Sequence, residues 1–180
     1  MKVVSIVGMA GAGKTEVAGV FEKHGFKRIR FGDITDIEIK KRGLTPNEAS
    51  ECLVREQLRQ EQGMDAYARL NLARINEALK QADVVIDGLY SWEEYIFLKE
   101  YYGPNFYVVA VWSAPETRYA RLTGRQNRGL TLEEAVSRDR TEIEIVNKAG
   151  PIAMAGFTII NESSLEELRE QAEKIIAGLK

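Results

Sequence analysis

The sequence predicts an α/β domain in which helices flank a five-stranded parallel sheet. Two observations support this fold class. Five short apolar segments, near residues 2, 27, 83, 106 and 156, alternate with stretches of helical pattern, as they do in successive β-α-β units. In addition, a glycine-rich segment follows the first apolar segment and leads directly into a helix. A strand, a loop and a helix in this order are the usual surroundings of a phosphate-binding loop.

The phosphate-binding loop is residues 8–15, GMAGAGKT, which fit the motif G-x-x-x-x-G-K-[ST]. Its glycines allow backbone conformations that a Cβ would block, so that successive N–H groups can face phosphate oxygens. We expect Lys14 to reach the β- and γ-phosphates of ATP and Thr15 to ligate Mg²⁺. The residues expected to bind ATP are Gly8, Gly11, Ala12, Gly13, Lys14, Thr15 and Glu16. The domain is therefore predicted to be a P-loop NTPase, and the strand and helix on either side of the motif disfavour a chance match.

Composition excludes several other classes of protein. The chain has 180 residues, 44% apolar and 29% charged, which suits one globular domain over residues 1–180. A net charge of -2 argues against a general nucleic-acid-binding protein, which needs a basic excess. The single cysteine, Cys52, excludes an internal disulfide and is expected to be half-buried on a helix. No apolar stretch approaches the ~20 residues of a membrane span. We therefore expect a cytoplasmic protein without a nucleic-acid or membrane partner, and its oligomeric state stays open.

The second strand brings a carboxylate to the edge of the sheet. The helix after the loop is expected to end at His24, which interacts favourably with the helix dipole. Residues 26–31, FKRIRF, alternate apolar and basic and predict the strand, after which Gly32-Asp33 opens a helix that runs to Lys41. Asp33 thus lies where a strand meets a helix, at the edge where open α/β sheets bind ligands. It is expected to be a helix N-cap, a catalytic carboxylate, or both.

The segment between the second and third strands is predicted to contain two further helices. Residues 47–81 are helical in pattern with one break at Gly63. Helices inserted at this point of a P-loop protein are a usual place for the phosphoryl acceptor to bind. We therefore expect an acceptor-binding helical insert at about residues 33–82. Most of its residues are nevertheless expected simply to cover the sheet.

The third and fourth strands are predicted from apolar runs. Residues 83–87, DVVID, end in an acid, and a carboxylate at the carboxyl end of a buried strand lies beside the phosphate-binding loop. We therefore expect Asp87 to hold Mg²⁺, directly or through water. The three aliphatic residues before it disfavour the alternative of a surface Asp-Gly turn. Residues 91–102 predict a helix whose aromatic residues belong to the core, and residues 106–112, FYVVAVW, predict a strand covered on both faces.

A stripe of arginines follows the fourth strand. Arg118, Arg121 and Arg125 are spaced by three and four residues, which puts them on one side of a predicted helix, and Arg128 follows in a loop. Few acids are interleaved with them, unlike on an ordinary solvated face. Guanidinium groups suit phosphate oxygens because each can donate two parallel hydrogen bonds. We therefore expect a phosphate-binding lid at about residues 115–131.

The C-terminal part is predicted to hold two helices and the last strand. Thr131-Leu-Glu-Glu134 is a capping box that opens one helix, on which Arg138 lies close to the lid. Residues 156–160 predict the strand, and Ser163-Ser-Leu-Glu166 is expected to cap the final helix. The residues expected to face the interior from these two helices are Ala135, Val136, Ile143, Val146, Leu165, Leu168, Ala172, Ile175, Ile176 and Leu179.

Two of these segments carry a family resemblance. Arg121-Leu-Thr-Gly-Arg125 resembles the opening of the adenylate kinase lid. The longer run from Arg118 through RLTGRQNRGLTLEEAVSRD, together with AGFTIINESSLEEL near the C-terminus, is similar to the C-terminal half of dephospho-CoA kinases. The resemblance implies a fold like that of nucleoside monophosphate kinases. It also implies ATP-dependent phosphorylation of the 3′-hydroxyl of dephospho-CoA, with Asp33 as the base and the arginines as the lid.

Other segments depart from the dephospho-CoA kinase pattern. The chain has Phe31-Gly32-Asp33 where that family has Asp-Ala-Asp. After the third strand it has Asp87-Gly-Leu-Tyr-Ser where the family usually has a leucine-rich turn. An Asp-Gly at this place is closer to adenylate kinases and to an archaeal group of adenylate-kinase-like P-loop proteins. Residues 43–82 match neither enzyme well, so the acceptor is less well defined than the fold and the donor.

The sequence therefore predicts a P-loop kinase that transfers the γ-phosphoryl of ATP to a small nucleotide-like acceptor, with dephospho-CoA as the first candidate. Lid closure over the γ-phosphoryl would exclude water, which otherwise would hydrolyse ATP. The expected metal ligands are Thr15 and Asp87. The expected catalytic residues are Lys14, Asp33, Arg121, Arg125 and Arg138, with Arg128 as an alternative to Arg138.

Two other functions fit the sequence. A nucleoside monophosphate kinase needs no base, because its acceptor phosphate is already ionised, but it needs an arginine in residues 32–82 to bind that phosphate. The candidates are Arg42, Arg55, Arg59 and Arg69. The other alternative is a non-enzymatic switch that binds ATP. The arginine lid argues against a switch, because a switch usually takes its arginine from a partner or lacks it.

Overall fold

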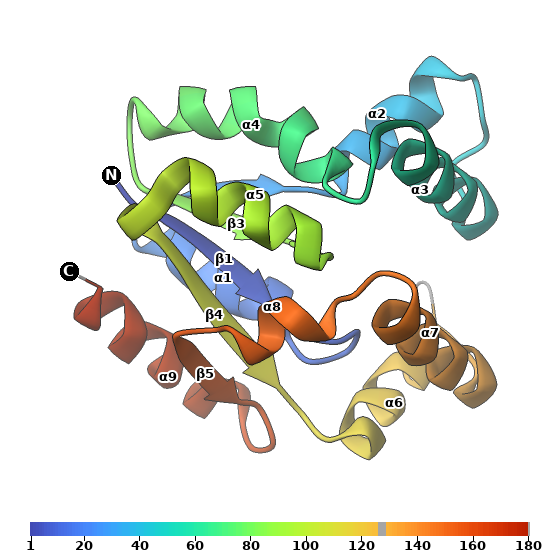
Figure 1. Cartoon of the computed structure of the whole chain (residues 1–180). Helices are drawn as coiled ribbons and strands as arrows, with labels where there is room; N and C mark the ends of the chain where they lie inside the picture. Colours follow the sequence, from blue (N-terminus) through green and yellow to red (C-terminus); the bar gives the residue numbers. More distant parts are fainter. Residues whose placement is uncertain (126–128, 180) are drawn as a thin grey trace.

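The computed structural model describes residues 1–125 and 129–179, and Figure 1 shows the course of the chain. The expected alternation of strands and helices is confirmed. In order along the chain, the elements are β1 (Val3–Val7), α1 (Lys14–Lys23), β2 (Lys27–Arg30), α2 (Asp33–Lys41), α3 (Glu48–Gln62), α4 (Ala66–Leu79), β3 (Val84–Asp87), α5 (Trp92–Tyr102), η1 (Gly103–Asn105), β4 (Phe106–Trp112), α6 (Pro115–Thr123), α7 (Leu132–Glu144), α8 (Ala149–Ala153), β5 (Phe157–Ile160) and α9 (Leu165–Gly178).

The sheet is five-stranded and parallel, as predicted, and its strand order is β2-β3-β1-β4-β5. β1 lies in the centre, where Ile6 is in register with Asp87 of β3 and Val7 with Ala110 of β4. Parallel strands all end at the same edge of a sheet. The phosphate-binding loop after β1 therefore lies beside the end of β3, with the end of β2 one strand further away.

Helices cover both faces of the sheet (Figure 1). α1 and α9 pack together on one face, and α4, α5 and α8 cover the other. Side chains of β1 point alternately to the two faces. Val3 and Val7 join the core beneath α4 and α5, whereas Val4 and Ile6 join the core beneath α1 and α9. All four are fully buried, as expected for a central parallel strand.

Two helix pairs lie beyond the carboxyl ends of the strands. α2 packs against α3, and α6 packs against α7. Figure 1 shows both pairs at the same end of the molecule, on either side of the loop that follows β1. The fold thus places the expected acceptor insert and the expected lid around the phosphate-binding loop. In the described part of the chain, the helices are too short or too polar to cross a membrane.

Helix capping matches the prediction at one of three places. Thr131 caps α7, where its hydroxyl accepts the N–H of Glu134 at 3.2 Å and the Glu134 carboxylate accepts the N–H of Thr131 at 2.7 Å. The expected cap at Ser163 is wrong by one residue, because Ser164 caps α9 and accepts the N–H of Glu167 at 3.1 Å. Both serines precede a glutamate by three residues, so the pattern alone fits either. Asp33 as an N-cap is also wrong, since Gly32 holds that position.

Some expected core residues are exposed. Val136, Ile143 and Leu165 are 47%, 49% and 45% exposed. α7 instead buries Ala135, Asp139 and Glu142, because the groups it faces are cationic side chains. A helix that packs through charged contacts does not follow the rule that the apolar side faces inward. Cys52 is exposed rather than half-buried, since α3 buries its other side through Val54 and Leu58.

Candidate functional site

The phosphate-binding loop joins β1 to α1 and bends at glycines with positive φ. Gly11 has φ 80° and Gly13 has φ 104°, which L side chains rarely adopt. Space is limiting as well, since a Cβ on Gly13 would lie 2.4 Å from Nδ2 of Asn161. The loop closes on itself through the N–H of Ala12, which donates to the carbonyl of Met9 at 3.2 Å. Glycines at these positions are therefore required by the observed backbone.

The carbonyl groups of residues 9–12 are all bound by side chains. Lys14 Nζ donates to the carbonyl of Met9 at 3.0 Å, and Arg118 Nη1 donates to that of Ala10 at 3.2 Å. Arg121 Nη1 donates to the carbonyl of Gly11 at 3.4 Å, and Asn161 Nδ2 donates to that of Ala12 at 2.8 Å. Successive N–H groups of such a turn can then face an anion, because the carbonyl dipoles are engaged elsewhere. The loop thus has the geometry of an anion-binding nest, braced by α6 and by the end of β5. Asn161 was not expected at the site, because the resemblance of its segment to dephospho-CoA kinases gave it no role and it lies 148 residues from Gly13.

The arginine stripe divides into residues with different surroundings. Arg118 is buried and forms a bidentate pair with Asp139 of α7, at 2.9 and 2.6 Å. The sequence predicted a phosphate-binding stripe of arginines with few acids among them. For Arg118 this is wrong, because Asp139 of another helix balances its charge. Arg121 also donates to the carbonyl of Asn161 at 2.9 Å. Arg125 is exposed just beyond the end of α6, and Arg128 lies outside the described residues.

Lys14 lies in a cluster of charged side chains. Burial, followed by the positive charge of Lys148, lowers the pKa of Lys14 to about 7. The carboxylates of Glu142 and Asp87 act in the opposite direction. A phosphate beside Lys14 would add to these carboxylates and favour its charged form. Without a bound anion, the two carboxylates therefore do not offset the effects of burial and of Lys148 on the Lys14 ammonium.

Lys148 and Glu142 were not expected at the site. Lys148 is 1% exposed, donates to Glu142 Oε2 at 2.6 Å and lies 5.2 Å from the centre of the Tyr90 ring. Glu142 also accepts from Arg138 Nε at 3.2 Å. Burial raises the pKa of Glu142, but Lys148 and then Arg138 outweigh it and hold the pKa at about 2. Glu142 is thus ionised and joins Arg138 and Lys148 into one unit near Lys14.

Thr15 and Asp87 have the chemistry of Mg²⁺ ligands. Hydroxyl and carboxylate oxygens suit this hard cation, which usually takes one or two protein ligands and completes its shell with phosphates and water. Accordingly, no cluster of three or more metal-binding side chains occurs among the described residues. Thr15 is exposed in the first turn of α1, and Asp87 ends β3. One oxygen of Asp87 accepts from Arg28 Nη2 at 2.5 Å, which fixes the orientation of the carboxylate.

Asp33 is held by two arginines at the carboxyl end of β2. Arg74 Nη2 donates to Oδ2 of Asp33 at 2.7 Å, and Arg30 Nη1 lies 3.7 Å from its Oδ1. The Asp33 side chain is 30% exposed, so it is accessible from solvent. β3 separates β2 from β1, and two strand spacings amount to about 10 Å across a sheet. The carboxyl end of β2 is thus about 10 Å from that of β1, where the phosphate-binding loop begins.

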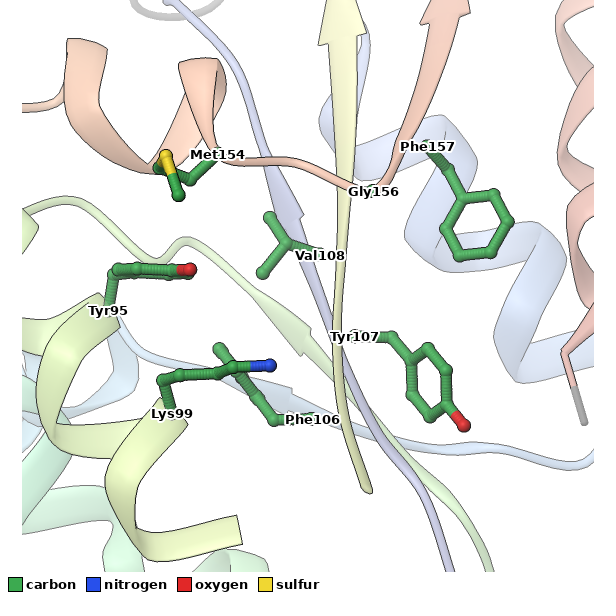
Figure 2. A pocket seen from close by; sticks show the side chains of 8 residues that line it. All are labelled: Tyr95, Lys99, Phe106, Tyr107, Val108, Met154, Gly156 and Phe157. Atoms are coloured by element: carbon green, nitrogen blue, oxygen red, sulfur yellow. The ribbon is translucent and has the colours of Figure 1, made fainter. Parts of the chain in front are cut away.

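A hollow of about 150 Å³ lies away from these residues. It is lined by the first residues of β4 and β5, together with Tyr95 and Lys99 of α5 and Met154 (Figure 2). These strand starts are at the opposite edge of the sheet from the phosphate-binding loop. Its lining is mostly apolar and aromatic, with Lys99 as its one cation. The hollow is therefore separate from the candidate site.

Comparisons of sequence show which proteins the chain is similar to. The profile of the AAA domain family matches residues 4–147. The UPF0200 protein TK1334 of Thermococcus kodakarensis is 35% identical over 97% of this chain and 96% of its own length. The UPF0200 protein PAE1629 of Pyrobaculum aerophilum is 33% identical over 100% of this chain and 99% of its own length.

Comparisons of structure agree on the fold. The crystal structure of TT1252 from Thermus thermophilus matches with a TM-score of 0.70 and 19% identity, covering 99% of this chain and 98% of that one. A gluconokinase from Sinorhizobium meliloti 1021 matches at 0.62 with 14% identity, over 98% and 92% of the two chains. Shikimate kinase from Acinetobacter baumannii in complex with shikimate matches at 0.59 with 21% identity, over 98% and 91%. The fold is one that small-molecule P-loop kinases share.

Proposed function

This chain belongs to the AAA domain family and to the UPF0200 proteins, and we propose that it is an ATP-dependent kinase of a small, nucleotide-like molecule. The observation that carries the proposal is the surroundings of Lys14. The loop carbonyls are braced from outside, Lys148 and Arg138 add positive charge, and two carboxylates end the neighbouring strands β3 and β2. A phosphate-binding nest with adjacent carboxylates suits the transfer of a phosphoryl group to an acceptor.

On the donor side, we assign the binding of the β- and γ-phosphates to the loop N–H groups and Lys14. Mg²⁺ would be held by Thr15 and Asp87, and it would neutralise charge on the phosphate oxygens. Arg121, Arg125 and Arg138 would stabilise the charge on the γ-phosphoryl as the lid at about residues 115–131 closes. Lys148 supports this role by holding Glu142 and, through it, Arg138.

On the acceptor side, we assign Asp33 to the hydroxyl that attacks. An oxygen–phosphorus bond forms between the acceptor hydroxyl and the γ-phosphorus, and the bond to the β–γ bridging oxygen breaks to release ADP. The hydroxyl proton passes to Asp33, whose orientation Arg74 fixes. The acceptor would bind in the helical insert at about residues 33–82, and dephospho-CoA is the first candidate because of the resemblance noted above.

An ADP-release assay with a panel of acceptors tests the proposal. The panel contains dephospho-CoA, AMP, CMP, deoxynucleoside monophosphates, gluconate and shikimate, with buffer alone as the baseline. We expect release to rise above this baseline with a hydroxyl acceptor, dephospho-CoA first. Turnover of monophosphates instead would identify a nucleoside monophosphate kinase, and tight ATP binding without turnover of any acceptor would identify a switch.

Lys14→Met provides the matched control for this assay. Methionine fills similar space without the charge, so the fold should be retained. Loss of one charge-stabilising contact to the transferred group should lower the rate by about a hundredfold or more. Acceptor-dependent ADP release at the wild-type rate in this variant would rule out the site and trace the activity to another source.

A further inference from the structure

The helical insert contains a group of polar side chains that the transfer chemistry does not use. Tyr67 of α4 belongs to the apolar core on this face of the sheet, Thr35 of α2 and Glu94 of α5 are buried, and Arg59 of α3 is half-buried. Tyr67 and Thr35 share a hydrogen bond of 2.7 Å, and the Arg59 guanidinium lies 5.4 Å from the centre of the Tyr67 ring. Polar groups buried in a core cost stability unless they are paired, so a group left unpaired there calls for an explanation.

Glu94 is fully buried and uses only one of its carboxyl oxygens. Oε2 accepts the N–H groups of Tyr90 and Ser91, at 2.8 and 3.4 Å, at the start of α5. Oε1 is buried and has no hydrogen-bond partner in the described part of the chain. Burial raises the pKa of Glu94 to about 7, even though the Tyr90 N–H and the charge of Arg59 act to lower it. Glu94 Oε1 therefore lacks a hydrogen-bond donor.

Arg59 is the complementary case. Its Nε is buried and without a hydrogen-bond partner among the residues described. The other arginines of the insert differ, because Arg42, Arg69 and Arg74 bind Glu38, Asp65 and Asp33. For Arg59, the described residues offer no carboxylate within 4.0 Å, and its guanidinium lies over the ring of Tyr67. Arg59 is thus short of an anionic partner.

We propose that Arg59 and Glu94 recognise the acceptor, and that the acceptor carries an anionic group together with at least one hydroxyl. The anionic group, a phosphate or a carboxylate, supplies the partner that Arg59 lacks. A hydroxyl donates the hydrogen bond that Glu94 Oε1 lacks. A ligand with only one of these groups would leave a buried polar atom unpaired, which explains why both are needed. The inference deepens the proposed function, on which it rests.

The position of the pair is suitable for an acceptor. Tyr90 connects the pair to the surroundings of Lys14, since the Lys148 ammonium lies 5.2 Å from the centre of its ring, and burial and the charges of Asp87, Glu142 and Glu94 all act to raise the pKa of its hydroxyl. Glu94 binds the N–H of the same residue. A molecule held at Arg59 and Glu94 would therefore lie beside the segment that joins β3 to α5, which follows Asp87. Because Glu94 is fully buried, binding there would require the surrounding helices to move.

Calorimetric titration of the ATP-free protein tests the inference directly. The probes are dephospho-CoA, AMP and gluconate, which carry both groups, adenosine, which lacks the anion, and inorganic phosphate, which lacks an organic hydroxyl. We expect at least one of the first three to bind, and to bind at least tenfold more tightly than adenosine or phosphate. Arg59→Met and Glu94→Gln should each weaken that binding by tenfold or more, whereas Arg59→Lys should lose less than Arg59→Met.

Two control variants separate recognition from structure. Glu134→Gln changes the equivalent glutamate of the capping box on α7, so it reports the effect of the cap alone. Arg140→Met removes an exposed arginine that is paired with Glu144. Both should leave probe binding unchanged. Glu94→Gln keeps an oxygen for the N–H groups of Tyr90 and Ser91, so the cap of α5 should persist, and its melting temperature checks this.

The outcomes separate this inference from the proposed function. Equal affinity of wild type, Arg59→Met and Glu94→Gln for the bound probe would overturn the inference, as would the absence of binding by every probe. In either case ADP release that depends on Lys14 would still support a kinase. Conversely, probe binding that depends on Arg59 and Glu94, without phosphoryl transfer to the bound probe, would overturn the kinase and retain the recognition site.

Discussion

The two lysines beside the phosphate-binding loop illustrate how much depends on single residues. Burial lowers the pKa of both Lys14 and Lys148, and the pKa of Lys14 is lowered further by the positive charge of Lys148. Glu142 compensates Lys148 directly at 2.6 Å, whereas Lys14 binds only a loop carbonyl. Negative charge introduced by a bound phosphate would thus act first on Lys14. We infer that binding of a triphosphate and protonation of Lys14 are coupled, and that binding weakens as the pH rises above about 7.

Asp33 provides a test of the acceptor at the same scale. If the acceptor reacts through a hydroxyl, Asp33→Asn should lower turnover by about a hundredfold or more, because the amide cannot take the proton. Stability should change by less than about 1 kcal/mol, because the pair with Arg74 is partly exposed and Asp33 does not cap α2. Turnover and melting temperature of Asp33→Asn and Asp33→Ala measure both effects. Unchanged turnover on dephospho-CoA would exclude Asp33 as the base.

Single residues also differ in how well the sequence identified them. Lys14, Thr15 and Asp87 follow from motifs whose spacing fixes where they lie. No motif spacing points to Lys148 or Asn161. Lys148 follows the end of α7, and Asn161 follows the short edge strand β5. Their contacts with Glu142 and with the carbonyl of Ala12 depend on how α8 and β5 pack. Contacts that depend on tertiary packing leave no periodic pattern in the sequence.

At the scale of elements, α6 and α7 are joined by a buried ion pair beside a small apolar cluster that includes Leu122 and Ala135. Arg118 and Asp139 form a buried bidentate pair, and the Tyr119 hydroxyl also donates to Asp139 at 3.0 Å. Arg118 binds the loop carbonyl of Ala10 from the same position. The pair therefore connects the lid helices to the phosphate-binding loop. Sequence periodicity placed Arg118 on one stripe with Arg121 and Arg125. It could not show the pairing with Asp139, because that acid is 21 residues away in the sequence.

Removal of one partner of this pair should be strongly destabilising. Arg118→Met leaves Asp139 buried without its cation, which typically costs about 3–5 kcal/mol of unfolding free energy. Asp139→Asn should cost less, because the amide keeps one acceptor oxygen. Urea unfolding of Arg118→Met, Asp139→Leu and the double variant Arg118→Met/Asp139→Leu gives the coupling energy. A double variant less stable than Arg118→Met would contradict this account, since replacing both charges removes the unpaired carboxylate.

Glu142 gives the contact between α7 and α8 a defined pH dependence. Its pKa is about 2 in the folded protein, below the ordinary value of 4.5, because Lys148 and Arg138 outweigh the effect of burial. The stabilisation is thus fully present above pH 4.5 and is lost as the pH falls from 4.5 to about 2. Unfolding free energies should decline in this window by a few kcal/mol more for wild type than for Glu142→Gln. Parallel pH profiles for the two proteins would contradict the assignment.

At the scale of the whole molecule, the parallel sheet brings distant segments to one edge. The loop after β1, Asp87 after β3 and Asp33 after β2 meet there because parallel strands end together. Alternation of apolar segments and helices was enough to predict this sheet. The insert was harder to predict, because α3 is mostly polar and the contact of Arg59 with the Tyr67 ring joins two helices that no local sequence pattern relates. Arg59 also belongs to the place where the acceptor is proposed to bind.

Transfer of a labelled γ-phosphoryl group tests the central claim most directly. Wild-type protein is incubated with Mg²⁺, ATP labelled in the γ-phosphoryl and each acceptor of the panel, and the products are separated by chromatography. The account predicts that the label appears in an organic phosphate ester, with dephospho-CoA the first acceptor expected, and that Lys14→Met abolishes its appearance. Label recovered only as inorganic phosphate, at the same rate with and without every acceptor, would contradict a kinase.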